Sequence, residues 1–345
     1  MKIALDVHGG DFGIEPNLRG AILAASSFDC EIIAVGRDTE IRECLRRVNA
    51  PSLPNLTIVH APDMIEMSAE PVQECRSKPD SSMMVCADLV AEGKADAFVT
   101  AGNSGAAMVA SLLKIKRMPG VMRPAIAVPF PTVKGTAVLM DGGANMDTKP
   151  WHLVQFAVMG SIYAKQALGV KNPSVGVLSV GEEETKGNDL VRSVIPLLKK
   201  SGLNYYGPVE GRDIPAGTTD VTVCDGFVGN ICLKISEGVA EAVFTILKKE
   251  IAENFSYKLG AFLMKGAFRK LKHKLNPDEF GGAPLLGVNG TVIICHGRSN
   301  STAIFNGIRV ARELVRSNAN SHILKALSEI TDTRDDSPEK EGSEV

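Results

Sequence analysis

The sequence predicts an α/β fold, with a largely parallel sheet and helices on both of its faces. Short β-branched runs that end in Gly, Asn or Asp recur along the chain, and helix-length segments follow them. Apolar residues make up 44% of the 345 residues and aromatic residues 5%, a composition typical of globular α/β enzymes. We expect one large catalytic unit over residues 1–330 and a disordered acidic tail over residues 331–345.

Nine runs predict strands, because each is rich in β-branched or other apolar residues and is bounded by turn-forming residues. In chain order they are KIALDV (2–7), EIIAVG (31–36), LTIVH (56–60), DAFVTAGN (96–103), AIAVPF (125–130), TAVLMDGGAN (136–145), SVGVLSVGEEE (174–184), DVTVCDGF (220–227) and TVIICHG (291–297). A long helix is expected from near Gly226, because apolar residues then recur at helical spacing through residue 255. Ligands bind outside the carboxyl ends of parallel strands, so the loops after these runs are the candidate site.

Charge and cysteine content exclude several classes of protein. The formal net charge of −2 provides no general field for nucleic acid, and no apolar run reaches the roughly 20 residues of a spanning helix. Seven cysteines form no C-x-x-C pair, and the first residues are typical of a strand rather than a signal peptide. We therefore expect reduced, buried thiols in a cytoplasmic protein, with no nucleic-acid partner, no cofactor and no metal site.

Four glycine-rich junctions follow predicted strands: DVHGGD (6–11), TAGNSGA (100–106), MDGGANMD (140–147) and GGAPLLG (281–287). Glycines let backbone N–H groups approach an oxyanion closely, so an anion such as phosphate suits these loops. None matches a P-loop or a strand-linked G-x-G-x-x-G, so no motif indicates a nucleotide. The candidate phosphate-binding residues are Gly102, Asn103, Ser104, Gly105, Gly143 and Asn145. The alternative is that these loops are ordinary tight turns.

The nonapeptide GEEETKGND (181–189) contains three successive carboxylates followed by Lys186. Acidic residues favour the first turn of a helix, so the carboxylates predict a helix start with Lys186 early in that helix. A cation there opposes the helix dipole, whereas an ammonium group at the carboxyl edge of a sheet suits a phosphate or a developing alkoxide. A two-metal carboxylate cluster is the competing interpretation, although no helical E-x-x-H accompanies the acids.

The segment CDGFVGN (224–230) has the same layout, with Asp225 after a strand and Asn230 entering the long helix. Asp225 predicts either a helix cap or a contact with substrate. The carboxamide of Asn230 can donate an N–H to an oxyanion without changing its own charge. Lys186 and Asn230 would therefore form a complementary pair.

Two further side chains follow predicted strands. Ser104 does not fit the G-x-S-x-G nucleophile elbow, and we expect it to donate a hydrogen bond or to cap its helix. His296, in CHGRSN, predicts either a contact with substrate or a structural hydrogen bond.

The segment from Phe255 to Leu275 contains no acidic residue and six lysines or arginines. At 100° per residue its apolar side chains fall on one stripe, which predicts a basic amphipathic helix. Each basic residue near an anionic bilayer contributes roughly 1 kcal/mol of attraction, so this helix suits a membrane surface. The residues expected to bind the membrane are Tyr257, Met264, Phe268, Leu271, Lys265, Arg269 and Lys272. The alternative is packing on a partner subunit, and we place the protrusion at about residues 250–278.

Together these motifs resemble those of a known family. The segments DVHGGDFGIEP, TAGNSGA, DGGANMDTKPWHLVQFAVMGSIYAK, VGVLSVGEEETKGND, VCDGFVGNICLKISEGVA and GGAPLLGVNGTVIICHGRSN stand in the order and approximate spacing of the bacterial phosphate acyltransferases, the PlsX family. The resemblance covers about residues 1–320. The family's opening usually reads like D-A-M-G-G-D-H-A-P, whereas here His8 replaces the methionine and Phe12 the histidine. A general-base imidazole at position 12 is therefore excluded.

The resemblance implies a fold similar to those of phosphotransacetylases and of isopropylmalate and isocitrate dehydrogenases. It implies a homodimer attached peripherally to the inner face of the cytoplasmic membrane. It also implies that inorganic phosphate attacks the thioester of acyl-acyl carrier protein, and that the acyl phosphate goes on to a membrane glycerol-3-phosphate acyltransferase at the start of phospholipid synthesis. By matching motifs, Lys186 and Asn230 are the expected catalytic residues.

The residues alone leave other functions open. A phosphotransacetylase acting on an acyl-coenzyme A thioester would use the same attack, and a decarboxylating dehydrogenase would share the fold. A non-catalytic membrane adaptor would use the basic helix to recruit a lipid enzyme.

Overall fold

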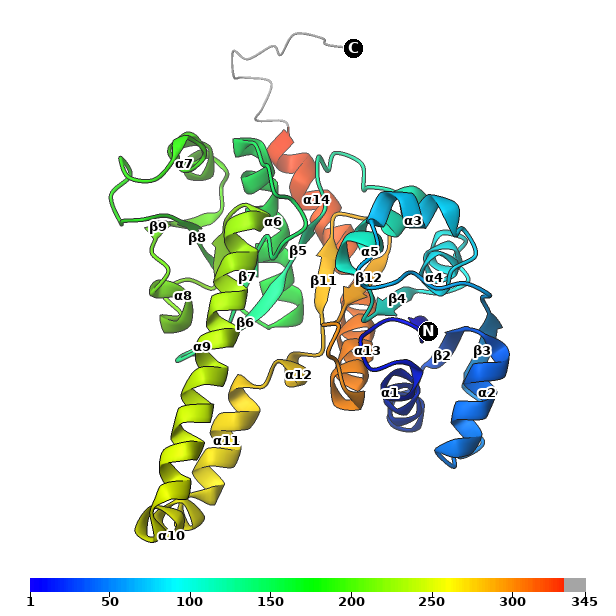
Figure 1. Ribbon diagram of the computed structural model, residues 1–345. Coiled ribbons are helices and arrows are strands. Elements are labelled where there is room, and N and C mark those ends of the chain that lie inside the picture. The colour runs from blue at the N-terminus through cyan, green and yellow to red at the C-terminus, as the bar shows by residue number, and fades with distance from the viewer. Residues whose placement is uncertain (332–345) are drawn as a thin grey trace.

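A computed structural model of the chain describes residues 1–331, with the side chains of all of them except residues 272, 273 and 331. Its strands confirm the α/β class but form two mostly parallel sheets, where the sequence suggested one (Figure 1). In order across the sheet, the seven-stranded sheet contains β3 (Leu56–His60), β2 (Glu31–Gly36), β1 (Lys2–Asp6), β4 (Ala97–Thr100), β12 (Thr291–Ile294), β11 (Ala283–Leu286) and β5 (Ala125–Ile126). The five-stranded sheet contains β6 (Val128–Thr132), β7 (Gly135–Met140), β10 (Val221–Val223), β8 (Ser174–Leu178) and β9 (Asn204–Val209).

The seven-stranded sheet is buried on both faces, as expected of parallel strands. Ile3 and Leu5 of β1 belong to the core on one face, whereas Ala4 belongs to the core on the other. The first face is covered by α1 (Ile14–Ser27), α2 (Asp38–Arg47) and α13 (Ser301–Arg316). The second is covered by α3 (Pro71–Ser77), α4 (Ser82–Ala91), α5 (Ser104–Ala110) and the π-helical turn η1 (Ser111–Ile115).

The five-stranded sheet is also covered on both faces. Val175 and Val177 of β8 pack with α6 (Pro150–Ala167) and α7 (Asp189–Lys200), whereas Leu178 packs toward α8 (Asp213–Ala216) and the start of α9 (Gly226–Glu253). Helices α6, α13 and α14 (Ala319–Thr331) belong to one core that is continuous between the two sheets. The acidic tail expected at residues 331–345 lies, beyond Thr331, outside the described residues.

The chain passes from the seven-stranded to the five-stranded sheet at Ala127, between β5 and β6. The Ala127 N–H donates to Pro284 O of β11 at 3.0 Å. The Gly142 N–H donates to Ile126 O at 2.9 Å, and the Ile126 N–H donates to the Asp141 carboxylate at 3.0 Å. The carboxyl end of β7 is therefore fastened directly to the crossing between the sheets.

The structure differs from the expected strands in three places. The run at 125–130 is divided between β5 and β6, because the chain changes sheets within it. The segment 281–287, expected as a glycine-rich junction after a strand, itself contains β11, which pairs antiparallel with β12 and β5. Strand β9 was not expected, because its sequence NYYGPV contains Gly and Pro; it forms at the edge of its sheet, where Pro is tolerated.

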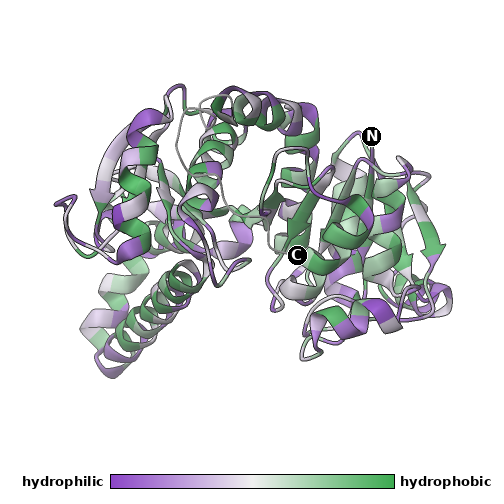
Figure 2. Ribbon diagram, turned by 90° about the horizontal axis from the view of Figure 1, so that it is seen from above, coloured by the Kyte–Doolittle hydropathy of each residue, from purple (hydrophilic) through white to green (hydrophobic). Residues whose placement is uncertain are grey.

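A helical protrusion extends away from both sheets (Figure 1). Helix α9 is about 42 Å long at 1.5 Å per residue; α10 (Phe255–Leu263) lies at the tip, and α11 (Lys265–Leu275) runs back beside α9 (Figures 1 and 2). The buried residues of α9 are Gly226 and Gly229, both in its first turn. The protrusion therefore starts within α9, well before residue 250, and ends at α12 (Pro277–Phe280).

The prediction of a single basic helix from Phe255 to Leu275 is wrong. The helix is divided at Met264, which ends α10 and precedes α11. Tyr257 therefore lies on a different helix from Phe268 and Leu271, and the expected continuous stripe is not formed. The spacing of apolar residues does not reveal this break, because Met264 is itself a good helix former and no Gly-Pro pair marks a turn there.

The tip of the protrusion exposes large apolar side chains. Phe255, Phe262 and Leu263 are 80%, 70% and 77% exposed. Every helix within residues 1–331 is too short or too polar to cross a bilayer. Lys272 was also expected to bind the membrane, but its side chain is not among those that the structure describes.

Candidate active site

Three neighbouring strands of the five-stranded sheet precede the loops that the sequence singled out. Strand β10 pairs in parallel with β7 on one side and with β8 on the other. Parallel neighbours lie about 4.8 Å apart and end at the same edge of a sheet. The segments 140–147, 224–230 and 181–189 therefore meet at one edge.

Asp141 organises the first of these loops. Its buried carboxylate accepts five hydrogen bonds of 2.7–3.2 Å. The donors are the backbone N–H groups of Ile126, Gly143, Ala144 and Asn145 and the side chain of Asn145. Burial raises the pKa of the Asp141 carboxyl, and these donors oppose the rise. The sequence predicted that backbone N–H groups of the GGAN loop bind phosphate. The N–H groups of Gly143, Ala144 and Asn145 do not meet this expectation, because they already donate to the Asp141 carboxylate.

The start of α9 packs tightly against the Asp141 loop. A side chain at Gly229 would begin 1.9 Å from Asp141 O, a distance that real Cβ atoms essentially never show, so position 229 requires glycine. One residue further along α9, Asn230 Cβ would lie 3.4 Å from a Cβ on Gly143. The structure therefore brings Gly143 and Asn230, two of the predicted site residues, into contact distance.

Two predicted ligand residues have partners within the protein. The Asp225 carboxylate accepts the Val228 N–H at 2.9 Å and caps α9. The Asn145 side chain donates to Pro124 O at 2.7 Å and to Asp141 at 2.9 Å. Both side chains stabilise the loops, and their contact with substrate stays a prediction.

Lys186 lies in a loop, so the expectation that the glutamates form the first turn of a helix, with Lys186 early in that helix, is wrong. The Lys186 N–H donates to Glu183 O at 2.9 Å in a turn, and Gly187 then takes a φ of +95° that no helix contains. Helix α7 begins at Asp189, capped by the Asn188 side chain. The short Asn side chain caps a helix better than the glutamates do, and it fixes the start three residues after Lys186.

The carboxylates beside Lys186 diverge. Glu182 lies 3.7 Å from the guanidinium of Arg212, and Glu184 lies 2.6 Å from the ammonium group of Lys199. Among the side chains that the structure describes, no group of three His, Cys, Asp or Glu is arranged to hold a metal ion. The Lys186 side chain is exposed at the same edge.

A pocket of about 200 Å³ opens between the loop that carries Lys186 and the start of α9. Its apolar lining consists of Leu153, Leu178, Val180, Leu190, Val191 and Val228. Gly187, next to Lys186, and Asp225, at the start of α9, also line it. Asn230 is half-buried on α9, two residues after Val228, and does not itself line this pocket. Both expected catalytic residues thus lie close in the sequence to residues that line this pocket, while their convergence on a reacting carbonyl stays a prediction.

A second group of loops meets at the carboxyl edge of the seven-stranded sheet, where β4 lies between its parallel neighbours β1 and β12. The Asp6 carboxylate accepts hydrogen bonds from Ser82 Oγ at 2.6 Å and from Thr100 Oγ1 at 2.8 Å. The Asp11 N–H donates to Gly297 O at 2.7 Å. The loops DVHGGD, TAGNSGA and CHGRSN are therefore joined to one another.

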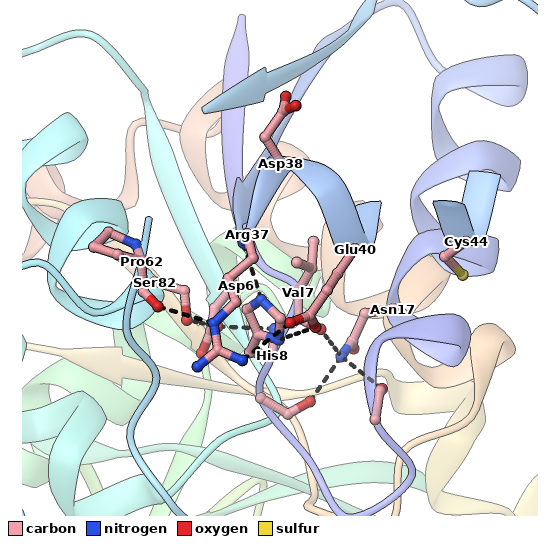
Figure 3. A network of polar contacts seen from close by, with 12 residues as sticks. Asp6, Val7, His8, Asn17, Arg37, Asp38, Glu40, Cys44, Pro62 and Ser82 are labelled. Atoms are coloured by element: carbon pink, nitrogen blue, oxygen red, sulfur yellow. Dashed lines mark hydrogen bonds and ion pairs between the residues drawn. The ribbon is translucent and has the colours of Figure 1, made fainter. Parts of the chain in front are cut away.

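His8 lies in a polar network behind these loops (Figure 3). Its Nε2 accepts the Arg37 N–H at 3.0 Å, and its Nδ1 lies 4.0 Å from Glu40. The Arg37 guanidinium donates to Pro62 O at 2.9 Å and to Glu40 at 3.0 Å. Burial lowers the pKa of His8, although Asp6 and Glu40 oppose the shift. His8 is therefore a neutral acceptor that fastens its loop to the end of β2.

The GNSG loop uses its own polar groups for structure. The Gly102 N–H donates to Thr100 Oγ1 at 2.9 Å, and Asn103 Oδ1 accepts the Ala106 N–H at 3.0 Å. Asn103 therefore caps α5, and the capping role expected of Ser104 is wrong, because Ser104 is already the first residue of the helix. The Ser104 side chain is exposed at this edge.

Gly105 and His296 complete the predicted site residues. A Cβ at Gly105 would lie 2.8 Å from Pro71 Cγ, so this glycine allows α5 to pack on α3. His296 is exposed, and its Nδ1 accepts the Arg298 N–H at 3.1 Å. This bond is the structural alternative that the sequence left open, and the contact with substrate stays a prediction.

All seven cysteines are free, and six of them are buried, which confirms the expectation of buried thiols. Burial raises the pKa of Cys75 to about 11 and that of Cys295 to about 12. Cys224 lies beside the candidate site, and burial raises the pKa of its thiol as well. Thiols with raised pKa values are poor nucleophiles, so the site does not favour a cysteine mechanism.

Solved structures of other proteins share this fold. A solved phosphotransacetylase from Streptococcus pyogenes matches with a TM-score of 0.64 and 18% identity, covering 92% of this chain and 94% of its own. A 4-hydroxythreonine-4-phosphate dehydrogenase from Klebsiella pneumoniae matches with a TM-score of 0.50 and 12% identity, covering 91% of this chain and 98% of its own. At these identities the likeness concerns the fold alone, and it confirms the expected similarity to phosphotransacetylases and to dehydrogenases.

Sequence similarity then shows the family. A family model described as "Fatty acid synthesis protein" matches residues 1–322. A phosphate acyltransferase from Elusimicrobium minutum is 53% identical over 329 residues, which are 95% of this chain and 96% of that protein. The chain belongs to the fatty acid synthesis protein family, and the resemblance to phosphate acyltransferases is confirmed.

Proposed function

We propose that this chain is an acyltransferase that moves a fatty acyl group from acyl-acyl carrier protein to inorganic phosphate. The product, an acyl phosphate, would begin phospholipid synthesis. The observation that carries this proposal is the 53% identity, over 95% of the chain, to a protein named phosphate acyltransferase. The candidate site supports it, because a mostly apolar pocket lies between the loop that carries Lys186 and the start of the helix that carries Asn230.

In the proposed reaction the protein has to stabilise two negative charges, and it does not have to provide a nucleophilic side chain. A phosphate oxygen attacks the thioester carbonyl and forms a C–O bond; the C–S bond then breaks, and the thiolate leaves and takes up a proton. Phosphate is already an anion at neutral pH, so no serine or cysteine is required. Negative charge develops on the carbonyl oxygen close to the phosphate charge, and Lys186 would reduce that repulsion while Asn230 donates an N–H to the oxygen.

Mass spectrometry tests the proposal directly. The purified chain is mixed with an acyl carrier protein thioester and orthophosphate, and acyl phosphate is measured. Acyl phosphate that requires all three components is the expected result. Free fatty acid alone, or no product, would reject the proposal.

The principal alternative is a phosphotransacetylase that uses an acyl-coenzyme A thioester. The shared fold keeps this alternative open, and the attack on the carbonyl would be the same. Measuring kcat/KM with both donors at equal acyl-chain length separates them. A higher value with coenzyme A would replace acyl carrier protein as the partner.

The proposal extends to the helical protrusion, which we place against the inner face of the cytoplasmic membrane. Phe262 and Leu263 are 70% and 77% exposed at its tip, and the exposed bases Lys265 and Arg269 follow them. Apolar side chains beside basic ones suit an anionic bilayer. Attachment there would bring the acyl phosphate close to a membrane glycerol-3-phosphate acyltransferase.

The proposal also includes a homodimer formed along α9. Ile235, Val239, Val243 and Ile246 of this helix are each 57–61% exposed, although they recur at helical spacing. A second copy of the chain, packed along the helix, would bury this stripe. Size-exclusion chromatography with light scattering would measure a dimer, and a monomer would reject this part of the proposal.

A further inference from the structure

We infer that the pocket beside Lys186 holds the part of the fatty acyl chain nearest the thioester. This inference rests on the proposed function and adds the place of the alkyl chain during transfer. The pocket lies between the loop that carries Lys186 and the start of the helix that carries Asn230. An alkyl chain attached to the reacting carbonyl would enter it without crossing water.

The polar residues that line the pocket are mostly engaged with the protein. The Asn188 side chain accepts the Val191 N–H at 2.9 Å, and the Asp225 carboxylate accepts the Val228 N–H at 2.9 Å. The Cys224 thiol faces a backbone carbonyl oxygen at 3.9 Å. An occupant with several amide groups would leave most of them without partners here, which costs free energy, whereas an alkyl chain needs none. The lining therefore favours an alkyl chain over the polar arm of the thioester donor.

One polar group in the pocket indicates how the acyl group would be oriented in it. The Ser179 hydroxyl is buried and makes no hydrogen bond within the part of the chain that the structure describes. It lies 3.0 Å from the point where a side chain on Gly187 would begin, next to Lys186. Leu153 of α6, 1% exposed, belongs to the buried wall. The carbonyl would therefore lie toward Lys186 and Ser179, and the alkyl chain toward Leu153.

The volume limits how much of the chain fits. An apolar cavity of about 150 Å³ binds benzene, with its six carbons, so a pocket of about 200 Å³ takes roughly six to eight carbons. Each buried methylene raises kcat/KM by about 4-fold, equivalent to about 0.8 kcal/mol. We therefore expect kcat/KM to rise with acyl-chain length and to level off once the pocket is full.

Exchanges of Leu190, which lines the pocket from the first turn of α7, test the inference. Leu190→Trp narrows the pocket and Leu190→Ala widens it. Leu197→Trp is the matched control, because Leu197 lies two helical turns further along α7, is also half-buried against the core, and does not line the pocket. The assay measures kcat/KM for acyl phosphate formation with acyl carrier protein thioesters of increasing chain length.

The expected result is a shift of the plateau in opposite directions. Leu190→Trp levels off at a shorter chain than the wild type, Leu190→Ala at a longer chain, and Leu197→Trp at the wild-type length. Equal losses at every chain length, or unshifted plateaus in both Leu190 variants, would overturn the inference, because a purely structural role predicts them. If the wild type forms no acyl phosphate from any thioester, the proposed function itself fails, and the two failures are thus distinguishable.

Discussion

Replacing Gly229 by alanine tests whether the contact of α9 with the Asp141 loop positions Asn230. The new methyl group would lie 1.9 Å from Asp141 O, and the contact must open to at least 3.0 Å, a shift of about 1.1 Å between backbone segments. Overpacking of this kind costs roughly 1–3 kcal/mol, and the better helix propensity of alanine offsets about 1 kcal/mol of it. We expect the free energy of unfolding to fall by up to about 2 kcal/mol. A displacement of about 1 Å at Asn230 lowers the rate by about 10²-fold.

Gly238→Ala is the matched control, since it makes the same exchange on the same helix and its added Cβ meets no atom within 4 Å. We expect it to be as active as the wild type and more stable by up to about 1 kcal/mol. Urea unfolding gives the stabilities, and mass spectrometric detection of acyl phosphate gives the rates. If Gly229→Ala equals Gly238→Ala in both measurements, the contact does not position Asn230 and the reasoning is refuted.

Three further predictions concern the site, the His8 network and the protrusion. Lys186→Ala and Asn230→Ala each lower kcat for acyl phosphate formation by about 10²- to 10³-fold without changing the melting temperature; wild-type kcat in either variant would remove that residue from the mechanism. Burial lowers the pKa of His8 below its ordinary 6.5, so the stability linked to its neutral form is present above that pH and is lost as pH falls. Urea unfolding at about pH 7.5 and about pH 5 should therefore show a smaller loss for His8→Gln than for the wild type, and equal losses would contradict the assignment. The double exchange Phe262→Glu and Leu263→Glu should abolish co-sedimentation with anionic vesicles but leave acyl phosphate synthesis in solution intact; unchanged co-sedimentation would favour a subunit interface at the tip.

The edge of the sheet that carries the candidate site could be predicted from the sequence. Each strand is a local β-branched run, and the loop after it is fixed by chain direction, so MDGGANMD, CDGFVGN and GEEETKGND were placed correctly at strand ends. The division into two sheets could not be predicted in this way. Strand order depends on contacts between distant segments, such as the pairing of β10 with β7 and β8, and no local pattern encodes it.

Local competition explains the wrong helix starts. Glutamates favour the first turn of a helix in general, but Asn188 provides a cap with the right short side chain, and Gly187 before it takes a positive φ. At α5 the choice lay between two neighbouring capping residues, and Asn103 takes that role instead of Ser104. Such choices depend on the exact path of the loop, which tertiary contacts decide.

The buried carboxylates of Asp6 and Asp141 were missed, although the sequence contains a sign of both. Each aspartate ends or directly follows a strand and precedes a glycine-rich turn, in LDVHGG and LMDGGAN. In the structure each accepts the N–H of the residue two positions on, at 3.2 Å in both loops. This is the local hydrogen bond that aspartate makes in turns, and it identifies the carboxylate as a part of the loop.

The glycine-rich loops therefore have a different physical meaning from the one expected of them. Glycine lets N–H groups approach an anion, but in the MDGGANMD loop the anion is the protein's own carboxylate at Asp141. That loop is ordered before any substrate arrives, so no free energy of binding is spent on arranging it. In the proposed mechanism the phosphate ion would therefore take its positive charge from elsewhere at this edge, and the neighbouring loop provides the exposed ammonium group of Lys186. In the proposed mechanism the loop packed against the start of α9 and the accessible lysine would be complementary parts of one site, and the Gly229→Ala and Lys186→Ala variants separate their contributions.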